Sequence, residues 1–201
     1  MKKLNILFLF LIPALIYSQS AKETLLSFQN KYKTVKSFTA DFAQETKSNL
    51  NKDTYKNSGK IYFEKINKFR IEFQGQLLIT DGTSVWNYNK KQNKVVITNY
   101  NSEPSVFSLD KYILDYPKDC EATYFNQAQK ILLLKPKKKG MDFKDIKIYT
   151  SNSQIMSRIE FTDANGNYYS FEFSNVKLNE KINGQQFTFI TPKGVRSVDL
   201  R

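Results

Sequence analysis

Histidine is missing from the chain, and cysteine occurs only at Cys120 among 201 residues. Without histidine the chain cannot build Ser-His-Asp triads, Cys-His dyads or histidine-containing zinc sites. One cysteine cannot form an internal disulfide, so we expect burial and strand pairing to hold the fold, with Cys120 as a small buried apolar side chain. These absences predict a protein that is not an enzyme and uses no metal or other cofactor.

Acidic residues are outnumbered by basic ones. The chain has 19 Asp and Glu against 31 Lys and Arg, a formal net charge of +12. A small hydrolase that works through paired carboxylates remains an alternative. Most acids, however, alternate with apolar residues, which indicates a solvated strand face. The acids considered are Asp41, Glu45, Glu64, Glu72, Asp81, Asp142, Asp145, Glu160 and Glu172.

Positive charge and interleaved aromatic residues are also typical of nucleic-acid binding. The lysines are spread over turns, as at residues 135–139, rather than along one strand face. Lysine-rich turns are usually solvated, and they can also steer a protein toward anionic lipid surfaces. We therefore expect no nucleic-acid partner.

Long apolar runs are limited to residues 4–17, which follow Lys2 and Lys3 and precede small and polar residues. This layout predicts a signal peptide over residues 1–18, removed on export, with an uncleaved anchor as the alternative. No second apolar stretch approaches the roughly 20 residues of a membrane helix. Residues 19–201, with 29 basic and 19 acidic residues and thus a formal charge of +10, suit a single domain.

Alternating apolar and polar residues fill the chain from Gly59 to Tyr100. Phe69, Ile71 and Phe73 alternate with charged residues, so one sheet face is apolar and the other is wet. The short connections, such as Asp81-Gly82, favour antiparallel neighbours. An apolar face so rich in aromatic residues is either a packed core or the lining of a cavity.

A helix is predicted at the start of the mature chain, where Ser20 and Glu23 form a capping box and apolar residues recur over 25–35. A second helical segment, over about 102–116, interrupts the strands and forms either a lid or a connection. About eleven strands and two main helices give a mainly β class: an open antiparallel sheet with helices on one side. Eleven strands are expected near 38–45, 55–63, 69–73, 76–80, 86–88, 94–98, 122–125, 131–134, 146–150, 155–161 and 168–173, and a last short strand is expected at 187–189.

The order of several motifs resembles the LolA family of periplasmic outer-membrane lipoprotein carriers, over essentially the whole mature chain. Each motif alone is common, whereas their order and spacing are more specific. They are the first helix, Phe-x-Ala-x-Phe-x-Gln over 38–44, Gly59, Lys68-Phe69-Arg70, Asp81-Gly82, Trp86-x-Tyr88-Asn89, Phe187-Thr188-Phe189 and Pro192-x-Gly194-Val195.

The resemblance implies an unclosed half-barrel covered by helices, whose apolar cavity holds the acyl chains of lipoproteins between the inner and outer membranes. It implies three partners: the acyl chains, an inner-membrane lipoprotein-releasing ABC transporter, and an outer-membrane acceptor or the outer membrane itself. We expect a periplasmic monomer. A lipid or lipoprotein sensor, or an envelope factor for another amphiphile such as a glycolipid, is the alternative with the same half-barrel; such relatives normally carry an additional domain.

The same resemblance suggests the residues of the cavity, although packing in an ordinary core is the alternative for each. One position departs from the family: an Arg-Pro pair is replaced by Lys65-Ile66 just before a turn. Lysine keeps the charge of the arginine that contacts the lid but lacks its planar fork of donors. The expected cavity residues are Tyr32, Phe69, Ile71, Phe73, Leu78, Trp86, Phe107, Leu109 and Ile113.

Overall fold

The computed structural model describes residues 19–65, 67–100, 111–150 and 155–201. Helix α1, Ala21–Lys33, begins where the sequence predicts it. Ser20 caps its first turn, and the Glu23 side chain accepts a hydrogen bond from the Ser20 N–H, so the capping box is present. The helix ends at Thr34, and the chain enters the first strand at Ser37.

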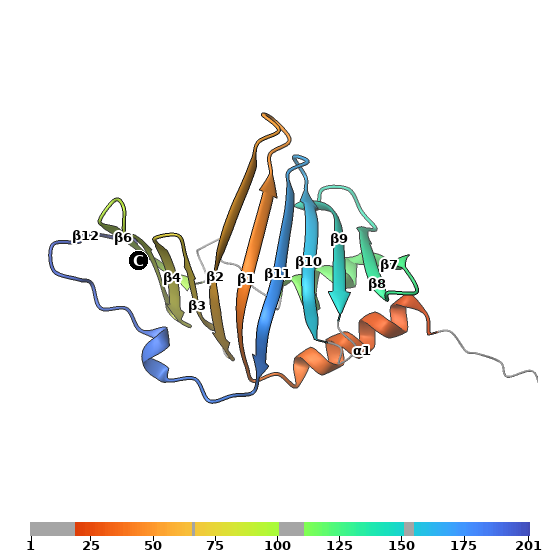
Figure 1. The fold of residues 1–201 in the computed structure, drawn as a ribbon, viewed down its shortest axis with the longest axis horizontal. Helices are drawn as coiled ribbons and strands as arrows, with labels where there is room; N and C mark the ends of the chain where they lie inside the picture. Colours follow the sequence, from red (N-terminus) through yellow and green to blue (C-terminus); the bar gives the residue numbers. More distant parts are fainter. Residues whose placement is uncertain (1–18, 66, 101–110, 151–154) are drawn as a thin grey trace, which may run out of the picture.

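A single sheet of twelve strands forms the rest of the domain (Figure 1), in the order β12-β6-β5-β4-β3-β2-β1-β11-β10-β9-β8-β7. It does not close, because β12 and β7 are not paired with each other. The predicted mainly β fold with an open antiparallel sheet is confirmed. The strands are β1 Ser37–Lys47, β2 Thr54–Glu64, β3 Lys68–Phe73, β4 Gln76–Asp81, β5 Ser84–Asn89, β6 Lys94–Asn99, β7 Cys120–Asn126, β8 Ile131–Pro136, β9 Phe143–Thr150, β10 Met156–Asp163, β11 Tyr168–Leu178 and β12 Arg196–Asp199.

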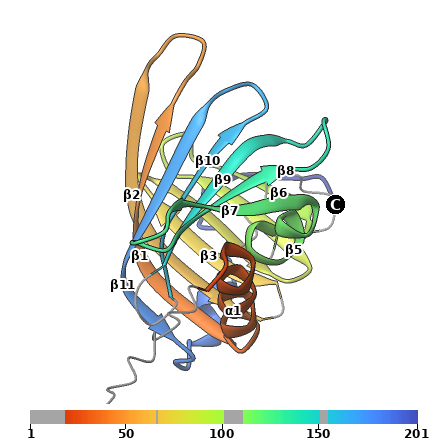
Figure 2. The ribbon, with the colours of Figure 1, turned by 90° about the vertical axis from the view of Figure 1, so that its right-hand side faces the viewer.

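The sheet curves around α1 (Figure 2), so it has a concave and a convex face. The register keeps apolar side chains on the concave face from strand to strand; Phe38, for example, pairs with Phe63 of β2 and with Leu178 of β11. The main core lies between this face and α1. Its buried members include Leu25, Phe28, Phe42, Ile61, Phe69, Leu132, Leu134, Ile146, Ile148 and Ile159.

A second, smaller core lies on the convex face of β3–β6. Phe187 is 2% exposed there, and the rings of Tyr88 and Phe189 are 5.4 Å apart. The predicted strand at 187–189 is wrong: Gly184–Phe187 is a 3₁₀ helix, capped by the Asn183 side chain. The alternation of Phe187 and Phe189 reflects two rings inserted into this core, while the last strand, β12, forms further on and pairs parallel with β6.

The second helical segment is described only from residue 111 onward. Lys111–Asp115 is a π-helical turn, followed by a 3₁₀ helix at Tyr116–Asp119. Ile113 is 1% exposed and joins the main core. The predicted cavity residues Phe107 and Leu109 lie outside the described residues.

Candidate apolar binding site

Four of the predicted cavity residues lie together on the concave face. Phe69 and Ile71 of β3 are buried there, whereas Phe73 and Leu78 are half-buried against the same core. Leu78 pairs with Ile71, which places both side chains on one face. The alternation read from the sequence therefore assigns these four side chains to one surface.

Gly59 makes space for this surface between two aromatic residues. It pairs with Phe42 on one side and Phe73 on the other. A Cβ at Gly59 would come within 1.9 Å of the Glu72 carbonyl oxygen, closer than any van der Waals contact allows. Only glycine allows the backbone of β3 to approach β2 this closely.

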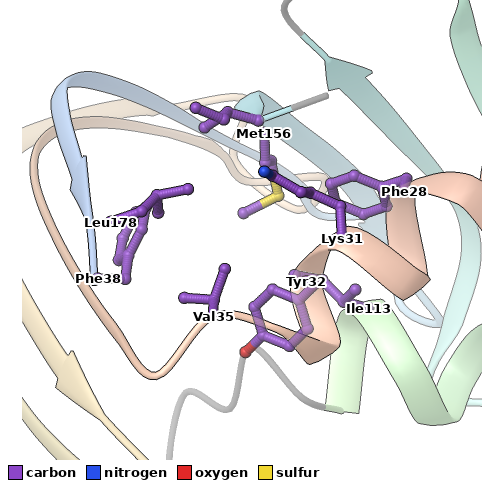
Figure 3. Close-up of a pocket in the computed structure, with 9 residues that line it drawn as sticks. Phe28, Lys31, Tyr32, Val35, Phe38, Ile113, Met156 and Leu178 are labelled. Atoms are coloured by element: carbon purple, nitrogen blue, oxygen red, sulfur yellow. The ribbon is translucent and has the colours of Figure 1, made fainter. Parts of the chain in front are cut away.

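A small cavity lies where α1 meets the sheet (Figure 3). Its volume is about 30 Å³, roughly the share of one water molecule in the liquid. Phe28 and Tyr32 of α1 are buried against the main core beside this cavity. The cavity is lined by Phe28, Lys31, Tyr32, Val35, Phe38, Ile113, Ile155, Met156 and Leu178.

Among the described residues, hydrogen bonds join α1 to other elements near its start, in its middle and at its end. Near its start, the Thr24 and Tyr124 hydroxyls are 2.6 Å apart. In the middle, the Gln29 side-chain amide donates to the Ile113 carbonyl at 2.8 Å. At its end, the Lys65 ammonium donates to the Lys33 carbonyl at 2.9 Å.

Lys65 therefore contacts α1. Its nitrogen also lies 5.5 Å from the centre of the Tyr32 ring, within the range of a cation–π interaction. A cation at the C-terminal end of a helix is favourable because the last carbonyls carry partial negative charge. The expected contact of Lys65 with the lid segment over about 102–116 stays a prediction, because that segment is described only from residue 111 onward.

A half-exposed aromatic surface continues the concave face along β10 and β11. Phe161 stacks on Tyr169 at 4.8 Å and on Phe171 at 6.3 Å, and none of the three is fully buried. Our sequence-based set did not include these residues. The signal was present, because the alternation of Ile159 and Phe161 with charged residues matches that of β3. Sequence alone could not show which aromatic residues α1 leaves uncovered.

Trp86 does not lie with these side chains, which corrects the sequence-based assignment. It pairs with Ile79 of β4, whereas Leu78 pairs with Asn87. Adjacent residues of a strand point to opposite faces, so Trp86 lies on the convex side with the second core. Trp86 and Tyr88 share a face as predicted, but it is the other face of the sheet.

The acids considered for hydrolysis lie mainly on the convex face in ion pairs with lysine or arginine. Asp41 pairs with Lys60 at 3.8 Å, and Glu172 pairs with Arg158 at 3.2 Å. Within residues 19–65, 67–100, 111–150 and 155–201, no cluster of three or more acidic, Cys or His side chains is arranged to hold a metal ion. Over the same ranges, no helix has the length and apolarity needed to cross a membrane.

An open, curved antiparallel sheet, with an apolar concave face under one amphipathic helix, defines a class of half-barrel proteins. Residues 33–190 match the family model described as outer membrane lipoprotein carrier protein LolA. Because this match covers most of the chain, the protein belongs to the LolA family.

The individual relatives share less than a third of their residues with this chain. The outer-membrane lipoprotein carrier protein of Bordetella avium is 27% identical over 197 residues, covering 94% of this chain and 92% of the relative. An uncharacterised protein of Methanocaldococcus jannaschii is also 27% identical, over 96% of this chain and 60% of its own length. Among solved structures, an uncharacterised conserved protein from Thermus thermophilus superposes with a TM-score of 0.56 at 18% identity, covering 90% of this chain and 99% of that one.

Proposed function

We propose that this protein is a periplasmic carrier that shields the acyl chains of lipoproteins on its concave face and delivers them from the inner to the outer membrane. The observation that carries the proposal is the continuous apolar face, which is buried under α1 at one end and half-exposed at Phe161, Tyr169 and Phe171. Membership of the LolA family and the names of its relatives support a carrier rather than an enzyme.

The energetics of α1 suit a carrier that must both hold and release its cargo. Each hydrogen bond is worth about 1 kcal/mol net, and each methylene hidden from water about 0.8 kcal/mol. About four buried methylenes therefore offset three hydrogen bonds of this kind. The rest of an acyl chain offsets the apolar surface that α1 exposes when it moves, so empty and loaded states can be close in free energy.

The proposed route begins with export. Residues 1–18 are removed, and residues 19–201 act in the periplasm as one domain and as a monomer. An inner-membrane lipoprotein-releasing ABC transporter supplies the cargo, and an outer-membrane acceptor or the outer membrane itself receives it. The proposed acyl-chain surface consists of Tyr32, Phe69, Ile71, Phe73, Leu78 and Ile113, extended by Phe161, Tyr169 and Phe171.

Binding of a synthetic triacylated lipopeptide to the mature protein tests this function. Phe73→Glu places a charge on the half-exposed part of the concave face, where its burial against an acyl chain is unfavourable. We expect the affinity to fall at least about tenfold. Phe125→Glu is the matched control, because Phe125 is 55% exposed and lies against Lys147 on the convex side.

Circular dichroism checks that both variants fold. Equal lipopeptide binding by folded Phe73→Glu and wild-type protein would exclude the concave face as the site. Mass spectrometry of lipids that copurify with the protein separates a lipoprotein carrier from a sensor or a glycolipid-handling factor. A protein isolated with glycolipid alone would contradict the proposal.

A further inference from the structure

The most exposed large apolar side chain among the described residues is Leu50, at 95% exposure. It lies in the turn between β1 and β2, and this hairpin projects beyond its neighbours at the top of Figure 1. The chain passes from α1 into β1 at the opposite end of the strands (Figure 1). Leu50 therefore contributes no buried surface to either core.

The turn around Leu50 is well ordered by its own hydrogen bonds. The Ser48 N–H donates to the Asp53 carbonyl at 2.9 Å, and the Asp53 N–H donates to the Asn51 side chain at 3.2 Å. Lys52 has a positive φ of 60° and donates to the Asn49 side chain at 3.0 Å. A polar residue at position 50 would serve this turn equally well, so local folding does not explain the leucine.

Two neighbouring turns join the first to form one surface. Asn49 donates from its N–H to the Asn167 side chain at 3.0 Å and from its own side chain to the Asn165 carbonyl at 3.0 Å. The Ala164 N–H in turn donates to the Asp142 carbonyl at 2.9 Å. We call this the tip surface: residues 48–53, 137–142 and 164–167.

The tip surface as a whole is basic and has Leu50 at its apex. It carries four lysines against two aspartates. Asp53 is engaged by the Asn51 amide at 2.5 Å and by the Tyr55 hydroxyl at 3.2 Å, whereas the lysine side chains are exposed. An apolar residue that projects from a basic surface is suited to a bilayer interface, where it reaches the acyl region while the ammonium groups meet phosphates.

We propose that the tip surface docks on an anionic lipid bilayer, with Leu50 inserted at the interface and the lysines among the headgroups. One leucine and a few lysines give weak, reversible attachment, as a protein that moves between two membranes requires. Docking at the tip is separate from the concave face, so it can be measured independently of acyl-chain binding. The same domain would then carry both the membrane contact and the half-exposed surface of Phe161, Tyr169 and Phe171.

Cosedimentation of the mature protein with vesicles of phosphatidylethanolamine and phosphatidylglycerol tests the proposal. We expect Leu50→Asp to weaken vesicle binding about tenfold, the effect of losing one inserted leucine. Ile190→Asp is the matched control, because Ile190 is 88% exposed in the C-terminal segment, and it should bind as the wild type does. Vesicles of phosphatidylcholine alone should bind less protein.

Insertion can be observed directly with an environment-sensitive fluorophore on Leu50→Cys, since Cys120 is buried. Its emission should shift to the blue on addition of anionic vesicles, whereas the same label on Ile190→Cys should not respond. Equal binding by Leu50→Asp and wild type, or attachment only to vesicles that contain a membrane protein, would overturn the proposal. Lipopeptide binding should be unchanged in Leu50→Asp, so a failed carrier function gives a different result from a failed docking surface.

Discussion

Glu160 shows how the convex face accommodates a carboxylate that is only 7% exposed. Lys147 lies 3.7 Å from it and Arg158 lies 3.5 Å away, so the charge is balanced by two cations. The Arg158 guanidinium also lies over the Tyr149 ring, 5.2 Å from its centre. The side chains on this polar face thus shield one another from water without a second layer of structure.

Tyr149 should report this environment in an alkaline titration. Burial, and then the charge of Glu160, raises the pKa of Tyr149 from its ordinary value of 10.0 to about 12. The folded state holds this proton more tightly than the unfolded chain, so its contribution to stability is present below pH 10 and is lost as the pH rises through about 12.

Absorbance of phenolate at equilibrium measures the titration. We expect Tyr149→Phe to remove a step near pH 12 and Glu160→Gln to move that step to lower pH. A difference spectrum between wild type and Tyr149→Phe that develops at the ordinary tyrosine pKa would contradict this assignment.

At single positions, the alternation of apolar and polar residues predicted which face of the sheet a side chain lies on only where one face of the strand was clearly apolar. Glu160 was correctly assigned to the polar face. Trp86 was assigned to the wrong face. Both faces of β5 carry apolar side chains, so only the pairing of β5 with β4 shows on which face of the sheet Trp86 lies. Burial depends on neighbours in other strands, so the pattern could not show that Glu160 would be nearly inaccessible.

Helix α1 is the element whose attachment matters most to the proposed function. Its start was predictable from the capping box, which is a local signal, and its apolar stripe was predictable from spacing. The contact of its last turn with Lys65 was not, because it joins residues 32 positions apart. The sequence predicted that Lys65 contacts the lid segment over about 102–116, whereas among the described residues it contacts the end of α1.

We expect Lys65→Leu to loosen the end of α1. Losing one hydrogen bond worth about 1 kcal/mol should raise local opening roughly fivefold. Lys65→Arg should restore or exceed wild-type protection, because a guanidinium offers more donors to the carbonyls at the helix end. Amide hydrogen exchange across Ala21–Lys33 is the measurement.

Lys36→Leu serves as the control, since it removes an exposed lysine beside the same helix end. If α1 exchanges alike in Lys65→Leu, Lys36→Leu and wild type, Lys65 is a solvated lysine without a role in holding the helix.

The short elements of the C-terminal segment were the least predictable. Phe187 and Phe189 alternate with a threonine in a pattern that is typical of a strand, yet the chain turns there in a 3₁₀ helix. The pattern was ambiguous because two aromatic residues two positions apart can also anchor a loop on an existing sheet. Strand β12 has only four residues and few apolar side chains. Its own sequence therefore does not predict a strand, which forms because β6 offers an edge to pair with.

Across the whole molecule, apolar side chains are buried on both sides of the sheet, but at different places. The main core occupies the concave face, while the C-terminal segment covers β3–β6 on the convex face. Arg70 extends across this second contact and donates to the Gln186 carbonyl at 3.5 Å. The strands that present the proposed binding surface are therefore supported from behind by a core that the cargo does not reach.

Phe187→Ala tests the contribution of this second core. Removing a buried phenylalanine ring should lower the free energy of unfolding by about 3–5 kcal/mol. Phe125→Ala, at a site that is 55% exposed, should cost less than about 1 kcal/mol. Urea denaturation of both variants gives the comparison, and similar losses would mean that the C-terminal segment contributes little to stability.

The open sheet also has to be protected from self-association. A half-barrel that stays open to admit a ligand retains two edge strands, and unpaired edges invite strand addition and aggregation. At one edge, β12 covers β6 with four residues, and the chain beyond it places the Arg201 guanidinium against Asp199, so the new edge is short and charged. At the other edge, α1 packs along β7, where Thr24 meets Tyr124. In the proposed carrier, movement of α1 to admit cargo would uncover the β7 edge, so loading would also raise the tendency to aggregate.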